Sequence, residues 1–228
     1  MKHAQVVPTF PKGTKYLYRL RRIKHCRTAA GRYLEVNLLG TFRECWYLTV
    51  MKWKSLESKQ VFKSGLVSVD QEKCEMPDGR IMPSYYILRF PDWVNIVPIT
   101  SDNKIVLIKQ YRHATGEIHW EVPGGAVHRG EDPKLGALRE LEEETGYSSE
   151  DILKVAENFP NPALQDNKIY TYLAKDCVLK GPQDLDPFED IEVELMELSQ
   201  LRKALEDGMF NHNIVVASLY QCLKHIKI

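Results

Sequence analysis

The chain has 228 residues, enough for one large domain or for one domain with an appendage. Apolar residues make up 43% and charged residues 27%, the ordinary composition of a soluble globular protein with a substantial core. No run approaches the ~18 consecutive apolar residues that a transmembrane helix requires, which excludes a helical membrane protein. The five cysteines are odd in number, widely spaced and without a CxxC pair. That pattern argues against a disulfide-built fold or a cysteine zinc site and favours a reducing cytoplasm.

Charge is uneven along the chain. Residues 1–50 hold 10 basic and 2 acidic residues, a net charge of +8, whereas the remainder holds 21 and 29, a net charge of −8. Within the basic part, residues 15–24 mix cations with apolar side chains, which suits an anionic surface. The segment contains no serine, unlike a typical transit peptide, and no apolar run follows the first lysines as in a secretory signal. Because Met51 reads like a second chain start, we expect residues 1–50 to be a weakly ordered basic extension. Binding of a membrane or nucleic acid by this arm is the alternative.

Strand patterns begin after the extension. Residues 61–69 and 85–90 are rich in β-forming side chains and flank the turn Pro77-Asp78-Gly79. Residues 51–91 are therefore predicted to form a small antiparallel β-domain, with residues 92–228 as the main domain. A second hairpin is predicted at 95–99 and 104–108, and further strands at 118–122, 169–173 and 191–195.

Three helices are predicted in the main domain. The first begins at Asp132-Pro133, where aspartate is an N-cap and proline takes the first helical position, and it ends at Gly146. The others span 199–206 and 211–227, and the last places four apolar residues on one face, namely Val215, Leu219, Cys222 and Ile226. Strands and helices in this arrangement indicate a mixed α+β fold or an α/β/α sandwich.

The first helix is unusually rich in carboxylates. Glu140 lies three and four residues before Glu143 and Glu144, so a helix places all three on one side. Three leucines, Leu135, Leu138 and Leu141, with Ala137 beside them, are predicted to form the buried stripe. Carboxylates this close repel one another unless they face water or hold a cation.

The spacing decides between those two possibilities. From Gly125 through Glu131, Arg139, Glu140, Glu143 and Glu144 to Gly146, every fixed position of the pattern GX5EX7REUXEEXGU is filled, where U is apolar. The chain therefore resembles the Nudix hydrolases over about residues 51–228. That resemblance implies a Nudix α/β/α sandwich with a mixed sheet, preceded by a small antiparallel β-domain.

The resemblance also implies a role for each residue of the pattern. Nudix substrates are diphosphates linked to another moiety, and placing them beside glutamates requires a hard divalent cation, for which Mg²⁺ is the natural choice and Mn²⁺ an alternative. The implied ligands are the Gly124 carbonyl, Glu140 and Glu144, with Glu143 as a further ligand or a contact to the attacking water. Support is expected from Gly125, which leaves room for the backbone, from Arg139, which orients the glutamates, and from Glu131, which ties the loop to the helix.

The flanking residues resemble those of the ADP-ribose pyrophosphatases. Lys109-Gln110-Tyr111-Arg112 and Trp120-Glu121-Val122-Pro123-Gly124-Gly125 match two of their patterns, and Pro162, sixteen residues past Gly146, matches a third marker. Arg112 is then expected to contact a phosphate, for which its planar fork is suited. Trp53 is expected either to stack on a purine base or to pack as an ordinary aromatic side chain. In this subgroup the small β-domain builds a homodimer, which is expected here too.

The general base in this subgroup tends to come from an acidic loop after the helix. Glu189 is the preferred residue here, with Asp190 and Glu192 as alternatives, and Pro187 stands where the family often has a second acid. The predicted activity is Mg²⁺-dependent hydrolysis of nucleoside diphosphate sugars in the cytoplasm, ADP-ribose foremost. Alternatives are GDP-mannose, a dinucleotide or a nucleoside triphosphate as substrate, or a non-enzymatic Nudix ligand sensor. Neither a membrane nor a nucleic acid is expected as a partner.

Overall fold

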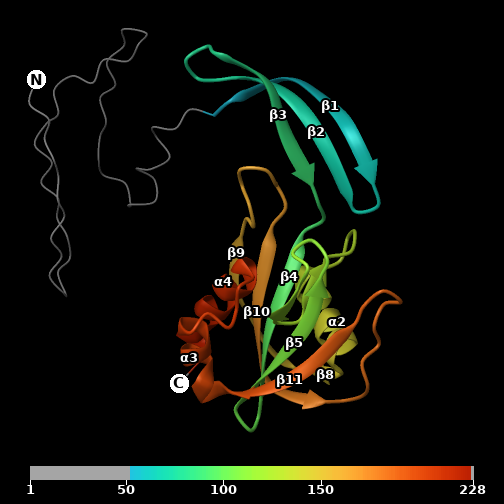
Figure 1. Cartoon of the computed structure of the whole chain (residues 1–228), viewed down its shortest axis with the longest axis vertical. Helices are drawn as coiled ribbons and strands as arrows, with labels where there is room; N and C mark the ends of the chain where they lie inside the picture. The colour runs from blue at the N-terminus through green and yellow to red at the C-terminus, as the bar shows by residue number, and fades with distance from the viewer. Residues whose placement is uncertain (1–51, 227–228) are drawn as a thin grey trace, which may run out of the picture. The chain divides into compact units, whose positions relative to one another are not determined.

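The computed structural model of the chain describes residues 52–226 (Figure 1). The expected basic extension, residues 1–50, lies outside the described residues. Residues 54–75 and 81–226 belong to one compact unit, and the turn at 76–80 belongs to a second unit with residues 52–53. Within that turn the Met76 amide donates to the Arg80 carbonyl oxygen at 2.8 Å.

A three-stranded antiparallel sheet comes first, in the order β1-β2-β3 (Figure 1). Its strands are β1 (Lys54–Ser64), β2 (Val67–Glu75) and β3 (Ile81–Arg89). The β1–β2 turn contains Gly65 at φ +50°, a left-handed conformation that favours glycine. Every residue of β1 is exposed. The predicted small antiparallel sheet is confirmed, and its first strand contributes nothing to a core within the described chain.

The main sheet has eight strands and is mixed. Its central order is β11-β5-β4-β10-β8, with β6 beside β5, β7 beside β4 and β9 beside β10. β10 runs parallel to β4, and the other pairs are antiparallel. The strands are β4 (Trp93–Thr100), β5 (Lys104–Arg112), β6 (Glu117–Glu121), β7 (Gly124–Ala126), β8 (Tyr147–Ser148), β9 (Asp151–Asn158), β10 (Ile169–Leu179) and β11 (Ile191–Glu197).

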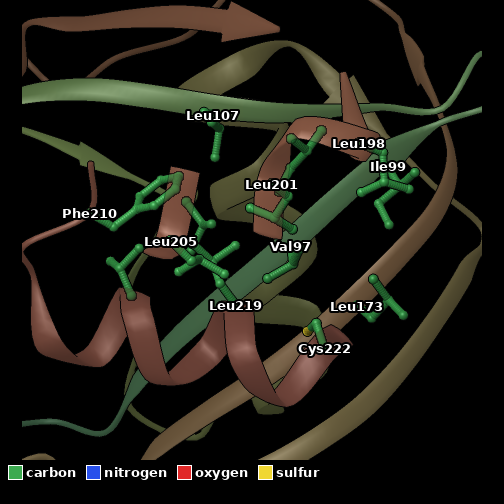
Figure 2. Close-up of a cluster of buried hydrophobic side chains, with 13 residues drawn as sticks. Val97, Ile99, Leu107, Leu173, Leu198, Leu201, Leu205, Phe210, Leu219 and Cys222 are labelled. Atoms are coloured by element: carbon green, nitrogen blue, oxygen red, sulfur yellow. The ribbon is translucent and has the colours of Figure 1, made fainter. Parts of the chain in front are cut away.

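Helices cover both faces of this sheet. Val97 and Ile99 of β4 pack with α3 (Leu201–Glu206) and α4 (Asn213–Cys222), the cluster shown in Figure 2. Val94 and Ile96, one residue out of phase, pack with α2 (Pro133–Thr145). Because neighbouring strand residues point to opposite faces, this alternation makes the molecule an α/β/α sandwich, as predicted. Short 3₁₀ turns precede α3 (Leu198–Gln200) and follow α4 (Leu223–His225).

The predicted buried stripe of α2 needs correction, and a strand was missed. Leu135 is not part of a buried stripe, because its side chain is 60% exposed, and Leu138 is only half-buried. α2 instead buries Gly136, Ala137, Glu140, Leu141, Glu144 and Thr145. Strand β9 was not predicted, since its sequence DILKVAEN mixes charges with apolar residues and its pattern of burial is irregular.

The last helix is shorter than the pattern indicated. α4 spans Asn213–Cys222 and continues only as a 3₁₀ turn, and Lys227 lies outside the described residues. Its predicted apolar face is confirmed, with Val215, Leu219 and Cys222 buried and Ile226 packed against them. No helix within residues 52–226 has the length and apolarity to cross a membrane.

Candidate active site

Both ends of α2 are fixed by the residues that predicted them. The Asp132 side chain accepts a 2.7 Å hydrogen bond from the Lys134 amide, and Pro133 is the first helical residue. At the other end Gly146 adopts φ +73° and its amide donates to the Glu142 carbonyl oxygen at 2.8 Å. These caps fix where the helix begins and where it ends.

Two glutamates of α2 are buried. Glu140 is 9% exposed and Glu144 is 3% exposed. Burial raises the pKa of the Glu144 carboxyl well above its ordinary value, and the charges of Glu140 and Glu189 raise it further, while a 2.8 Å bond from the Gly124 amide opposes them. Burial also raises the pKa of Glu140, against the charge of Arg139. The site therefore holds two carboxyls whose charged forms are disfavoured by burial, a cost that a bound cation would offset.

The glycine pair of β7 lies against these carboxylates. A Cβ on Gly124 would come within 2.2 Å of the Val94 carbonyl oxygen. A Cβ on Gly125 would come within 2.5 Å of Oε1 of Glu140. Both contacts are closer than real Cβ atoms show. At Gly124 the obstacle is the backbone of β4, so a side chain there would push the strands apart, whereas at Gly125 a side chain would displace the carboxylate of Glu140.

Arg139 joins the loop to the carboxylates. Its Nε donates to Glu131 Oε1 at 3.0 Å, and its Nη1 donates to Glu140 Oε1 at 2.9 Å and to Glu143 Oε2 at 2.8 Å. Glu131 also accepts from the His128 amide at 2.8 Å, which holds the loop before α2. The guanidinium thus touches three carboxylates at once, and this raises its pKa.

A cleft of about 1190 Å³ opens over this region. The predicted site residues that line it are Arg112, Gly124, Gly125, Glu131, Arg139, Glu140, Glu143, Glu144 and Glu189. Among the described residues, Pro162, Asp190 and Glu192 are not in its lining, and Pro162 is exposed in the loop between β9 and β10. Trp53 comes just before β1, in the unit that also contains the turn at 76–80, and it is 42% exposed.

The loop before β11 is tied to the C-terminal end of α2. Gln183 Nε2 donates to the Glu144 carbonyl oxygen at 2.7 Å, and the Asp184 amide donates to the Glu143 carbonyl oxygen at 2.9 Å. Glu189 is half-buried and accepts from the Asp186 amide at 3.1 Å. Asp184 and Asp186 line the cleft as well, and neither was singled out from the sequence. The acidic residues around Pro187 were the available signal, but that signal could not show which of them face inward.

Arg112 reaches the cleft from β5 and is paired with Glu121 of β6. Its Nε and Nη2 donate to the two carboxylate oxygens at 2.9 and 2.7 Å. Glu121 belongs to the flanking pattern at residues 120–125, which predicted no role for it.

The site suits a divalent cation, although no group of three His, Cys, Asp or Glu side chains in the described residues forms a ready-made metal cage. Mg²⁺ is usually bound by one or two carboxylates together with waters and substrate phosphates, so a complete protein cage is not needed. The buried Glu140 and Glu144 offer oxygen ligands whose negative charge the protein offsets only in part. The donor chemistry therefore fits the expected ion.

Comparison with known proteins agrees with this geometry. The chain matches the Nudix domain over residues 90–218. It is 35% identical to a methanol dehydrogenase activator from Bacillus methanolicus, over 75% of this chain and 96% of the relative. It is 32% identical to an ADP-ribose pyrophosphatase from Bacillus subtilis, over 68% of this chain and 80% of the relative. A crystal structure described as an ADP compounds hydrolase superposes with a TM-score of 0.69 at 26% identity, covering 78% of this chain and 95% of that one. Since the Nudix match spans more than half of the chain and carries the capped, glutamate-rich helix, this protein belongs to the Nudix family of hydrolases.

Proposed function

We propose that this Nudix hydrolase cleaves the diphosphate linkage of ADP-ribose and releases AMP and ribose 5-phosphate. The observation that carries the proposal is the pair of buried carboxylates, Glu140 and Glu144, against the glycine pair of β7, in a cleft that also holds Arg112. Such a site suits a dianionic group that arrives with a cation. The relative named ADP-ribose pyrophosphatase and the structure named ADP compounds hydrolase support the choice of substrate.

The proposed cofactor is Mg²⁺, with Mn²⁺ as a substitute. Its protein ligands would be the Gly124 carbonyl, Glu140 and Glu144, with Glu143 as a further ligand or a contact to the attacking water. Bound there, the ion would offset the charge on the diphosphate oxygens and make a water molecule easier to deprotonate. Arg139 and Glu131 would keep the glutamates oriented through the hydrogen bonds described above.

The test of the function is a product-resolved panel with and without Mg²⁺. The substrates are ADP-ribose, GDP-mannose, a dinucleoside polyphosphate and a nucleoside triphosphate. We expect ADP-ribose to be cleaved with the highest kcat/KM, to AMP and ribose 5-phosphate, and only with a divalent cation. A higher kcat/KM for another substrate would change the assignment, and no turnover of any substrate would favour a ligand sensor.

Glu189 is the proposed general base. It lines the cleft and its charge raises the pKa of Glu144, whereas Glu192 pairs with Lys109 at 3.4 Å outside the cleft. Glu189→Gln should lower kcat ~10²–10⁴-fold, the usual contribution of a positioned base, and change KM by only a few-fold. Asp190→Asn and Glu192→Gln are matched controls that should change kcat much less. Equal, small losses in all three variants would move the role of base to Glu143 or another residue of α2.

We also propose a homodimer built through the small sheet. All of β1 is exposed, including the apolar Leu56, Val61 and Phe62, and such a long bare strand normally has a partner. In that assembly Trp53 would stack on the purine base and Pro162 would lie near bound substrate. A chain starting at Met51 should remain dimeric by analytical ultracentrifugation and keep its kcat, and a monomer would contradict the proposal.

The free, buried thiols of Cys74, Cys177 and Cys222 support the proposal of a reducing, cytoplasmic location.

A further inference from the structure

Glu121 is a buried carboxylate outside the glutamate helix. It is the last residue of β6, and its side chain is only 4% exposed. Both of its oxygens accept from Arg112, at 2.9 Å from Nε and 2.7 Å from Nη2. This two-point contact fixes the plane of the guanidinium as well as its position, which a single hydrogen bond would not do.

The pair leaves part of Arg112 available to a ligand. The arginine side chain is 41% exposed and lines the cleft. Its Nη1 donates no hydrogen bond to any residue within 52–226. One edge of the guanidinium is therefore held by Glu121, and the other keeps N–H groups free for the oxygens of a diphosphate.

An imidazole side chain stands behind the carboxylate. His212, the residue before α4, has its Nδ1 3.3 Å from Glu121 Oε1. That nitrogen is buried and makes no hydrogen bond of good geometry to any described residue. The Glu121 carboxylate is the charged group that it faces. Burial raises the pKa of Glu121, but Arg112 and His212 outweigh it and lower the pKa to about 2. Glu121 is thus ionised throughout the range in which enzymes work.

The segment that carries His212 is itself anchored. The ring of His119 lies 6.3 Å from that of His212 in an edge-on arrangement. His119 is 7% exposed, and its two nitrogens lie 2.7 Å from Thr115 Oγ1 and 2.7 Å from Asn211 Oδ1. The β5–β6 turn, strand β6 and the start of α4 therefore converge behind one arginine.

We propose that Glu121, backed by His212, is a positioning residue that aims Arg112 at the diphosphate of the substrate. This inference rests on the proposed function, because it assumes a diphosphate in the cleft. A purely structural ion pair is the competing explanation. Burying an ion pair contributes little to stability compared with an apolar pair, so stability alone gives a weak reason for this arrangement.

A double-mutant cycle separates the two explanations. Glu121→Gln keeps the shape of the side chain but lets the guanidinium move, and kcat/KM for ADP-ribose should fall ~10–100-fold, as for a slightly misplaced catalytic group. Arg112→Ala should lower kcat/KM ~10²–10³-fold, the scale of losing one electrostatic contact to the transition state. If Glu121 acts through Arg112, the double variant should equal Arg112→Ala alone.

Two further variants serve as controls. Glu194→Gln removes the partner of Lys109 on the same strand β5, a 2.7 Å ion pair whose residues do not line the cleft, and should leave kcat/KM within about two-fold. Arg112→Lys keeps the charge but lacks the fork, and it should lose nearly as much as Arg112→Ala. That variant also tests the geometry if Glu121→Gln does not fold, as judged by its thermal transition.

Losses that multiply in the double variant, or full activity in Arg112→Lys, would overturn the inference. Wild-type protein that leaves ADP-ribose intact would instead contradict the proposed function. The cycle would then be measured by calorimetric binding of ADP, which carries the same diphosphate. Glu121→Gln should again weaken binding in the presence of Arg112 and have no effect without it.

Discussion

Helices α2 and α4 cover opposite faces of the same central strands, β4 and β10, yet they bury different chemistry. α4 buries Val215, Leu219 and Cys222, and its contacts with Val97 and Leu173 form an ordinary apolar core (Figure 2). α2 buries Leu141 and Ala137 but also the carboxylates Glu140 and Glu144. One face of the sheet is therefore built for stability, and the other gives up apolar burial for a charged site.

The energetic consequence differs between the two faces. Apolar burial contributes about 25 cal/mol per Å² removed from water, so α4 adds directly to the free energy of unfolding. A buried carboxylate instead costs free energy unless a cation or hydrogen-bond donors offset its charge. Glu144 has the Gly124 amide but no guanidinium or ammonium group in hydrogen-bond contact within residues 52–226. In the proposed function a cation would complete the α2 face, whereas the α4 face needs no ligand.

The largest expected effect comes from removing one charge on the α2 face. Glu144→Gln keeps the side-chain shape and its bond from the Gly124 amide, and kcat should fall at least ~10²-fold. Its Tm without divalent cations should equal or exceed that of the wild type, because burial disfavours the charged carboxyl. Glu142→Gln, at an exposed position of the same helix, is the matched control and should retain wild-type kcat. Near-wild-type turnover of Glu144→Gln in saturating Mg²⁺ would remove the distinction between the two faces.

Shortening a buried side chain of α4 should have the opposite effect, with a loss of stability and little change in kcat. Leu219 is fully buried, so Leu219→Ala should lower the free energy of unfolding by ~2–5 kcal/mol in urea titration. Because the residue packs in the cluster on the α4 face and does not line the cleft, kcat per folded molecule should stay within about two-fold. A fall in kcat comparable to that of Glu144→Gln would show that the two faces are not separable.

The smallest effect is expected at an apolar residue of α2 that faces water. Leu135→Gln should change the free energy of unfolding by less than about 0.5 kcal/mol, since the side chain is 60% exposed. Leu141→Ala on the same helix, at a fully buried position, should cost ~2–5 kcal/mol. A large loss at Leu135 would mean that this surface is covered in the assembled protein.

These two leucines also mark what the sequence alone could predict. The ends of α2 and the position of its glutamates follow from local chemistry, namely the Asp132 cap, Pro133 and Gly146. The prediction for Leu135 was wrong because the sequence offers two possible buried sides of this helix, the leucine stripe and the carboxylate side. Only packing against the sheet determines which of the two is buried. The sheet selected the carboxylate side, which helix periodicity by itself cannot indicate.

Sequence patterns could not predict which residues from distant segments of the chain meet at the site. His212 lies 3.3 Å from Glu121 only because α4 begins beside the end of β6, and no spacing rule connects the two positions. The acidic loop was recognised by composition, but the inward direction of Glu189, Asp184 and Asp186 depends on hydrogen bonds between that loop and the end of α2. Local motifs predicted the helix, and tertiary packing determined which side chains meet at it.

Electron paramagnetic resonance of Mn²⁺ tests the central claim most directly, because it counts free ion without requiring turnover. Mn²⁺ would be titrated into the wild type, Glu142→Gln and Glu144→Gln. We expect the first two to bind the ion equally and Glu144→Gln to bind it at least ~10-fold more weakly, since even an outer partner of a metal ligand contributes that much. Equal affinity in all three proteins would contradict the claim that the buried carboxylates of α2 hold the cation.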